Sequence, residues 1–124
     1  FGQHCPDWVG IVENNTISDL DSILVIKNDL DTMLKNEPQK IVLGCTHYPF
    51  LLKTLSKFAP EELFIDPAIP FAEFIKNDLE HSNLLNKSNN KSFEEFYVSS
   101  EPIKFQKAAK MFYNLKSVPK LLTF

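Results

Sequence analysis

The sequence predicts an α/β fold whose sheet is mostly parallel. Three observations predict it. Short apolar runs with the length of buried strands alternate with segments in which apolar residues recur at helical spacing. The chain has 124 residues, is 44% hydrophobic and 23% charged, and can therefore form an ordinary globular core. The sequence also has no internal repeat over this length.

The first half of the chain is expected to form a helix, a strand and a second helix. Apolar residues recur at helical spacing over 18–36, with Ser18 as the N-cap and Pro38 as the stop. The continuous apolar run 41–44 is typical of a strand buried on both faces. Pro49 fits the first turn of the helix that follows. The apolar faces are Leu20, Ile23, Leu24, Leu30, Met33 and Leu34 in the first helix, and Phe50, Leu51, Leu55 and Phe58 in the second.

The alternation continues after the second helix. A short strand is expected over 63–65, followed by a helix that opens at Pro70 and buries one apolar face. The stretch 81–92 is rich in Asn, Ser and Lys, which predicts a solvated linker. The buried face of the helix is expected to contain Phe71, Phe74, Ile75 and Leu79.

The last part of the chain is expected to contain a strand and a helix. The strand covers 93–98, and the helix runs from Pro102 to about Leu115 with Ser99 and Ser100 able to cap it. The predicted domain organisation is an α/β portion, a polar linker and a strand–helix segment, over 1–80, 81–92 and 93–124.

The composition narrows the classes of partner. The net charge is −3 and all thirteen basic residues are lysine, so there is no basic stripe for nucleic acid or an anionic membrane surface. Without arginine, an acidic ligand must be bound by backbone N–H groups, hydroxyls or a lysine. Two cysteines and the lack of an apolar run of about 18 residues favour the cytoplasm. The chain opens at Phe1 without a start signal, which suggests a fragment of a longer protein.

Cys45 is the strongest candidate for chemistry. It follows the apolar run 41–44, and ligands of open α/β sheets bind outside the carboxyl ends of the strands. Gly44 allows a ligand to approach the backbone, and Thr46 adds a hydroxyl that can bind a carboxylate. A thiol close to the start of a helix ionises more readily, and His47 is near enough in sequence to exchange a proton with it.

Two other interpretations of Cys45 remain open from the bare pattern. A cysteine after a buried strand is often only a small hydrophobic core residue. A zinc site is the weaker alternative, because Cys45 and His47 have no second pair of ligands at a regular spacing. Of the other candidates, Cys5 is expected to be structural, and His4 and His81 are expected at the surface.

The segment Gly44-Cys-Thr-His-Tyr-Pro49 resembles the motif around the second active-site cysteine of cofactor-independent glutamate racemases. Related aspartate racemases usually carry glutamate at the position of His47. Three looser similarities follow in the family's order: Cys5-Pro6 with Val12-Glu13, Phe64-Ile-Asp-Pro67 with Ala72, and Val98-Ser-Ser-Glu-Pro102 with Phe105. The chain departs from the family at His4, Asp7 and Trp8, and at Ser100, where glycine is common.

The resemblance implies a reaction and a role for each site residue. Members of the family invert the α-carbon of glutamate with two cysteines, one on each face, without a pyridoxal cofactor or a metal, and supply D-glutamate for peptidoglycan. Cys45 would take the proton from L-glutamate, and His47 would assist it. Thr46 would hold the charged groups of the substrate beside Cys45, and Gly44 would also border the substrate. Glu13 would contact the substrate ammonium or tune His47, and a solvated carboxylate is the alternative interpretation.

The resemblance also implies that half of the site lies elsewhere. It predicts a Rossmann-like, three-layer αβα architecture that forms one half of a two-domain racemase. The segment 93–124 would return to the first domain, and the complete enzyme would be a cytoplasmic homodimer. Three alternatives remain: a racemase acting on aspartate or another small acid, a non-catalytic fragment or binding module, and a hydrolase with Cys45 as covalent nucleophile.

Overall fold

The computed structural model describes residues 1–88 and 92–123. The chain divides into two compact units, Phe1–Leu85 and Asn86–Phe124, and each is described by itself. The predicted linker, 81–92, therefore lies partly outside the described residues.

The first unit opens with a helix that the sequence did not lead us to expect. Helix α1 (Pro6–Glu13) has its proline in the first turn, where a missing backbone N–H costs nothing. Its buried residues are Trp8, Ile11 and Val12, which lie on one face of the helix. The signal was present in the sequence as a proline followed by apolar residues at helical spacing.

Helix α2 (Leu20–Leu34) confirms the first predicted helix but not its cap. The residue before its first turn is Asp19, and Ser18 lies outside the helix. The buried residues are Ser22, Ile26, Leu30 and Met33, whereas Leu20 is 80% exposed and Leu24 is 56% exposed. The buried face is thus narrower than the apolar pattern suggested, because it is limited to the residues that meet α1 and α3.

Strands β1 (Ile41–Val42) and β2 (Phe64–Ile65) pair in parallel, with Ile41 opposite Phe64. The amide of Leu43 extends the pairing by donating to the Ile65 carbonyl at 2.9 Å. The expectation of a run buried on both faces is wrong at Val42, which is 59% exposed, whereas Leu43 is 1% exposed. The described elements of this unit therefore cover only the face of the run on which Leu43 lies.

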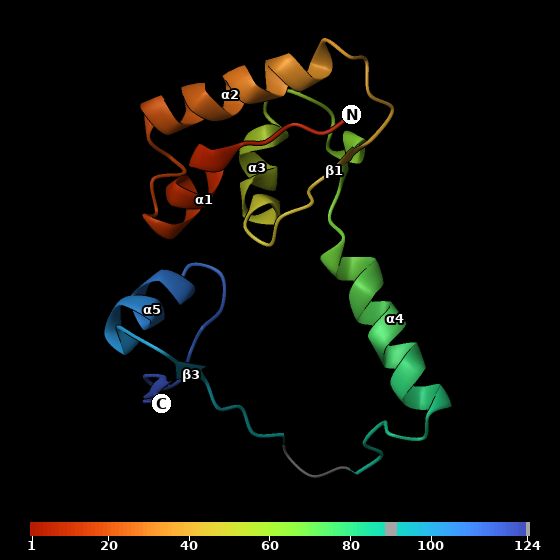
Figure 1. Cartoon of the computed structure of the whole chain (residues 1–124), viewed down its shortest axis with the longest axis vertical. Coiled ribbons are helices and arrows are strands. Elements are labelled where there is room, and N and C mark those ends of the chain that lie inside the picture. Colours follow the sequence, from red (N-terminus) through yellow and green to blue (C-terminus); the bar gives the residue numbers. More distant parts are fainter. Residues whose placement is uncertain (89–91, 124) are drawn as a thin grey trace. The chain divides into compact units, whose positions relative to one another are not determined.

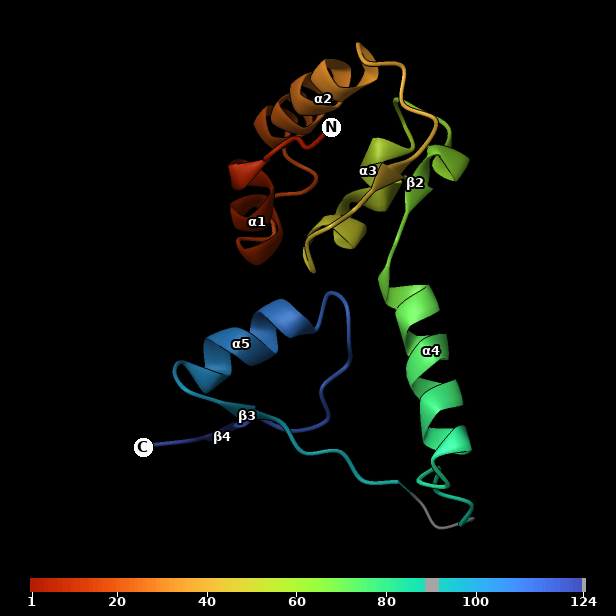
Figure 2. The same ribbon diagram turned by 45° about the vertical axis from the view of Figure 1, so that its right-hand side comes forward.

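The second predicted helix is split into two short pieces. A 3₁₀ helix, η1 (Tyr48–Leu51), contains Pro49 in its first turn and leads directly into α3 (Leu52–Leu55). Figures 1 and 2 both show α3 between α1 and the strand pair, with α2 above α1 and α3. The core of the unit consists of Cys5, Trp8, Ile11, Val12, Ile26, Leu30, Met33, Leu43, Leu51 and Leu55.

A short 3₁₀ turn, η2 (Glu61–Leu63), leads into β2, and helix α4 (Ala68–His81) follows that strand. The helix begins two residues before Pro70, and its first amide donates to the Asp66 carboxylate at 2.9 Å. The predicted burial of its apolar face is wrong. Exposure is 62% at Phe71, 64% at Phe74 and 43% at Ile75, because the described elements of the unit do not cover this face.

The second unit contains β3 (Tyr97–Val98), α5 (Pro102–Ala109) and β4 (Lys120–Leu121). Its two strands pair in parallel, with Tyr97 opposite Lys120, and β4 was not predicted. Helix α5 ends well before Leu115. The residue at its N-cap is Glu101, which has a left-handed φ of 45°, so neither Ser99 nor Ser100 occupies the cap position. Two side-chain contacts also join distant parts of the unit: Lys120 donates to Glu95 at 2.7 Å, and the Tyr113 hydroxyl donates to Glu94 at 2.6 Å.

Candidate active site at Cys45, His47 and Glu13

Cys45 lies in the tight turn between β1 and η1. Its carbonyl accepts a hydrogen bond from the Tyr48 amide at 3.1 Å, and the residue is half-buried. The Gly44 amide donates to the Val42 carbonyl at 2.9 Å, so this N–H is already engaged within the turn. A Cβ placed on Gly44 would meet nothing within 4 Å, so the backbone is open to a ligand on that side.

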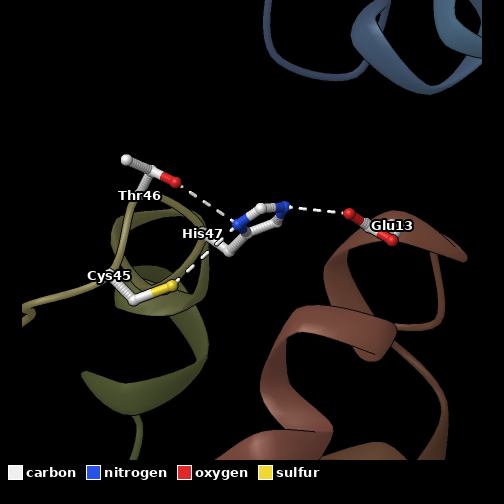
Figure 3. Close-up of polar contacts among 4 residues, drawn as sticks. All are labelled: Glu13, Cys45, Thr46 and His47. Carbon is white, nitrogen blue, oxygen red and sulfur yellow. Dashed lines mark hydrogen bonds and ion pairs between the residues drawn. The ribbon is translucent and has the colours of Figure 1, made fainter.

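The imidazole of His47 lies between Cys45 and Glu13 (Figure 3). Its Nδ1 is 3.9 Å from the Cys45 Sγ and 3.4 Å from the Thr46 hydroxyl oxygen. Its Nε2 is 3.2 Å from the Glu13 Oε1. One ring nitrogen thus faces the thiol and the hydroxyl, and the other faces the carboxylate.

This arrangement is suited to proton transfer. With its proton on Nε2, the neutral ring donates to Glu13 and leaves Nδ1 free to accept from the thiol or from Thr46. A carboxylate on the far nitrogen stabilises the positive ring that forms when Nδ1 takes up the thiol proton. The Glu13 side chain is 63% exposed and that of His47 is 31% exposed, so water weakens the ion pair and its attraction is small when the ring is neutral.

The structure brings together four of the five predicted site residues through direct contacts: Cys45, Thr46, His47 and Glu13. Gly44 is the chain neighbour of Cys45 and contacts none of the other side chains by a hydrogen bond in the described structure. Glu13 is the last residue of α1, so its approach to His47 depends on that helix packing beside η1. His4 and His81 are exposed, as expected.

Cys5 has a different environment from Cys45. It is fully buried in the core, and burial, with a smaller contribution from the Asp29 charge, raises its pKa to about 11. A neutral, enclosed thiol has little nucleophilic character. Cys5 therefore lies where a structural cysteine is expected, and Cys45 is the cysteine that solvent and ligands can reach.

Tyr48 supports the site, and our reading of the sequence gave it no role. Its hydroxyl donates to the Cys5 carbonyl at 3.0 Å, and its ring packs edge-on against Trp8 with centroids 4.9 Å apart. Tyr48 lies directly after His47, so these contacts join the turn to the start of α1. The only sequence feature that pointed to Tyr48 was its position inside the motif Gly44-Cys-Thr-His-Tyr-Pro49.

A hollow of about 1050 Å³ lies beside the turn, within the first unit. The opening segment of the chain and β1 line it, and both Cys5 and Cys45 contribute to its wall. Among residues 1–88 and 92–123, no three His, Cys, Asp or Glu side chains are grouped so as to hold a metal ion. None of the helices in the described ranges has the length and apolar character needed to span a membrane.

Sequence and structure comparisons identify the proteins that this chain is similar to. No family model matches the chain. The glutamate racemase of Carboxydothermus hydrogenoformans is 31% identical over 119 residues, which cover 94% of this chain and 44% of that protein. The glutamate racemase of Prochlorococcus marinus strain NATL2A is 34% identical over 116 residues, covering 91% of this chain and 43% of that protein.

A solved structure gives the same result. The glutamate racemase of Francisella tularensis, in complex with D-glutamate, superposes with a TM-score of 0.82 at 26% identity, over 96% of this chain and 45% of that chain. This likeness confirms the α/β, Rossmann-like fold class expected from the sequence. The chain spans slightly less than half of the length of the relatives it matches. In sequence and in fold, the chain is therefore similar to the C-terminal half of glutamate racemases.

Proposed function

We propose that this chain supplies one half-site of a glutamate racemase, an enzyme that interconverts L- and D-glutamate. The contact between His47 and Cys45 on one side and Glu13 on the other carries the proposal, because it gives Cys45 a route for exchanging protons. The similarity of nearly the whole chain to glutamate racemases supports the choice of substrate. The remainder of the enzyme, joined to this chain or separate from it, supplies the other half-site.

In the proposed reaction Cys45 acts on the L-face of the substrate. The thiolate takes the α-proton of L-glutamate, the C–H bond breaks, and its electron pair is delocalised into the substrate carboxylate. A thiol of the other half-site then donates its proton to the opposite face of the α-carbon, which gives D-glutamate. Cys45 is left protonated. His47 accepts this proton on Nδ1, which restores the thiolate, and releases it to water, while the thiolate of the other half-site takes up a proton from water.

Thr46 and Gly44 are proposed to border the substrate. Thr46 is exposed, and its hydroxyl lies 3.4 Å from the ring nitrogen that faces Cys45, so a substrate carboxylate bound by Thr46 would lie close to the thiol. Gly44 contributes space and not a donor, since its amide is already bonded to Val42. This division suits a chain that has no arginine to bind the acid.

The other half of the enzyme is the proposed partner. The exposed apolar face of α4 supports this, because isolated surface hydrophobics are ordinary but a row on one helix face marks an interface. We further propose that 93–124 completes the fold of the absent domain, that the complete enzyme is a cytoplasmic homodimer, and that its D-glutamate supplies peptidoglycan synthesis.

Reconstitution tests the proposal. The purified chain is mixed with a polypeptide that carries the other half of a glutamate racemase, and circular dichroism follows L-glutamate over time. We expect turnover from the mixture, none from either part alone, and none when Cys45→Ser is used. Turnover by this chain alone would contradict the need for two half-sites.

The same mixture separates the alternatives. Aspartate offered in place of glutamate tests the related racemases, and His47 favours glutamate. A non-catalytic fragment is supported by the partial coverage of the relatives and would give a stable complex without turnover. A hydrolase would leave a covalent acyl adduct on Cys45, which mass spectrometry detects.

A further inference from the structure

Tyr48 links the two segments that carry the site. Its hydroxyl and the Cys5 carbonyl are 3.0 Å apart although the residues are 43 positions apart. The ring of Tyr48 meets the ring of Trp8 at 68°, an edge-to-face contact of the kind that stabilises aromatic pairs. The Tyr48 side chain thus contacts two residues at the start of α1, Cys5 and Trp8.

These contacts bear directly on the distance between His47 and Glu13. Cys5 immediately precedes α1, and Glu13 is the last residue of that eight-residue helix. His47 immediately precedes Tyr48. Fixing Tyr48 to the start of α1 therefore limits how far the imidazole can move from the carboxylate at the other end of the same helix.

The Tyr48 contact is better protected than the ion pair it supports. The hydrogen bond to Cys5 is partly buried, whereas the Glu13 side chain is 63% exposed. Water and salt weaken an exposed pair, so such a contact cannot by itself fix the imidazole. The phenol also remains protonated, and so remains a hydrogen-bond donor, to a higher pH than an ordinary tyrosine, because burial raises the pKa of Tyr48.

We propose that Tyr48 is a positioning residue, whose hydrogen bond to Cys5 and packing on Trp8 hold His47 within reach of Glu13. The purpose of this pairing, to assist Cys45, rests on the proposed racemase function. The positioning itself is a property of this chain and can be measured without turnover.

Nuclear magnetic resonance of the imidazole nitrogens tests the proposal in the ¹⁵N-labelled chain. Glu13→Gln is expected to shift the His47 ring signals, and the exposed His4 and His81 provide internal references that should not move. In a Tyr48→Phe background the same Glu13→Gln change is expected to lose most of its effect on His47. Tyr113→Phe is the matched control, since it also removes a phenol hydrogen bond but lies in the other unit.

The outcomes separate positioning from general support of the fold. A full Glu13-dependent shift in folded Tyr48→Phe protein overturns the proposal, as does an equal loss in Tyr113→Phe. If Tyr48→Phe does not fold, Tyr48→3,5-difluorotyrosine serves instead, because raising the pH ionises its hydroxyl in the folded chain. The Glu13-dependent shift should then disappear with that ionisation, and its persistence overturns the proposal. Failure of the racemase function alone would show as an inactive reconstituted mixture with the imidazole result intact.

Discussion

The Nε2 of His47 lies 3.2 Å from the Oε1 of Glu13, across 34 positions of sequence. The opposite ring nitrogen faces the thiol of Cys45 at 3.9 Å. A single imidazole therefore has a proton acceptor on one side and a proton donor on the other. This geometry leads to separate expectations for each of the three residues.

Replacing Glu13 by glutamine should reduce activity with little effect on stability. Glutamine keeps a hydrogen-bond acceptor near the ring but no longer stabilises its positive form. We expect a lower kcat in the reconstituted enzyme, with a smaller loss than that from His47→Asn. The free energy of unfolding should change by less than about 1 kcal/mol, because the pair is exposed. A large loss of stability in urea denaturation would instead indicate a structural carboxylate.

Cys45→Ser and His47→Asn should differ in severity. A serine hydroxyl is too weak an acid to form the base at neutral pH, so Cys45→Ser should nearly abolish racemisation. His47→Asn keeps hydrogen bonding and removes proton transfer, so the loss should be on the order of 10²–10⁴-fold. Both rates are measured in the reconstituted enzyme.

The His47→Asn loss should also depend on direction. If Cys45 serves the L-face, kcat should fall most from L- to D-glutamate, with KM changing in parallel because the two enantiomers are equal in free energy. Progress curves started from each enantiomer measure both values. Equal losses of kcat in the two directions, together with a lower Tm, would favour a structural role for His47.

Alkaline pH should destabilise the chain through Cys5. Its pKa is about 11 in the folded chain and is raised from 9.0 by burial, so the folded state holds the proton more tightly than the unfolded state. The stabilisation is complete below pH 9 and is lost as the pH rises through about 11, by an amount on the order of 3 kcal/mol. Urea denaturation between these values measures the loss. Cys5→Ala should flatten this pH dependence, and an unchanged slope would show that another group is responsible.

A charge on the exposed face of α4 should leave the first unit intact but weaken its association. Phe74 is 64% exposed, so Phe74→Lys should change the free energy of unfolding by no more than about 0.5 kcal/mol. Binding to the other half of the enzyme should weaken, as titration calorimetry would measure. Leu30→Lys is the contrasting variant, because it places a charge in the core and should unfold the chain. Unchanged binding by Phe74→Lys would exclude this face from the interface.

The sequence alone was sufficient to predict the local features of this protein. The apolar run 41–44, followed by Gly44 and Cys45, indicated a strand end with a polar turn, and the structure has β1 followed by that turn. Helical spacing located α2, and the alternation of strands and helices predicted parallel pairing. These features depend on residues close together in the chain, whose periodicity reflects backbone geometry directly.

Only the tertiary structure decided burial and the contacts between distant segments. Phe71 on α4 and Val42 on β1 have the sequence pattern of core residues but are exposed, because burial depends on whether another element covers a face. Glu13 and Tyr48 acquire their partners through the packing of α1 beside η1, a contact that no local pattern encodes. The motif thus indicated which residues are proposed to perform the chemistry, and the packing of one unpredicted helix brought Glu13 to His47.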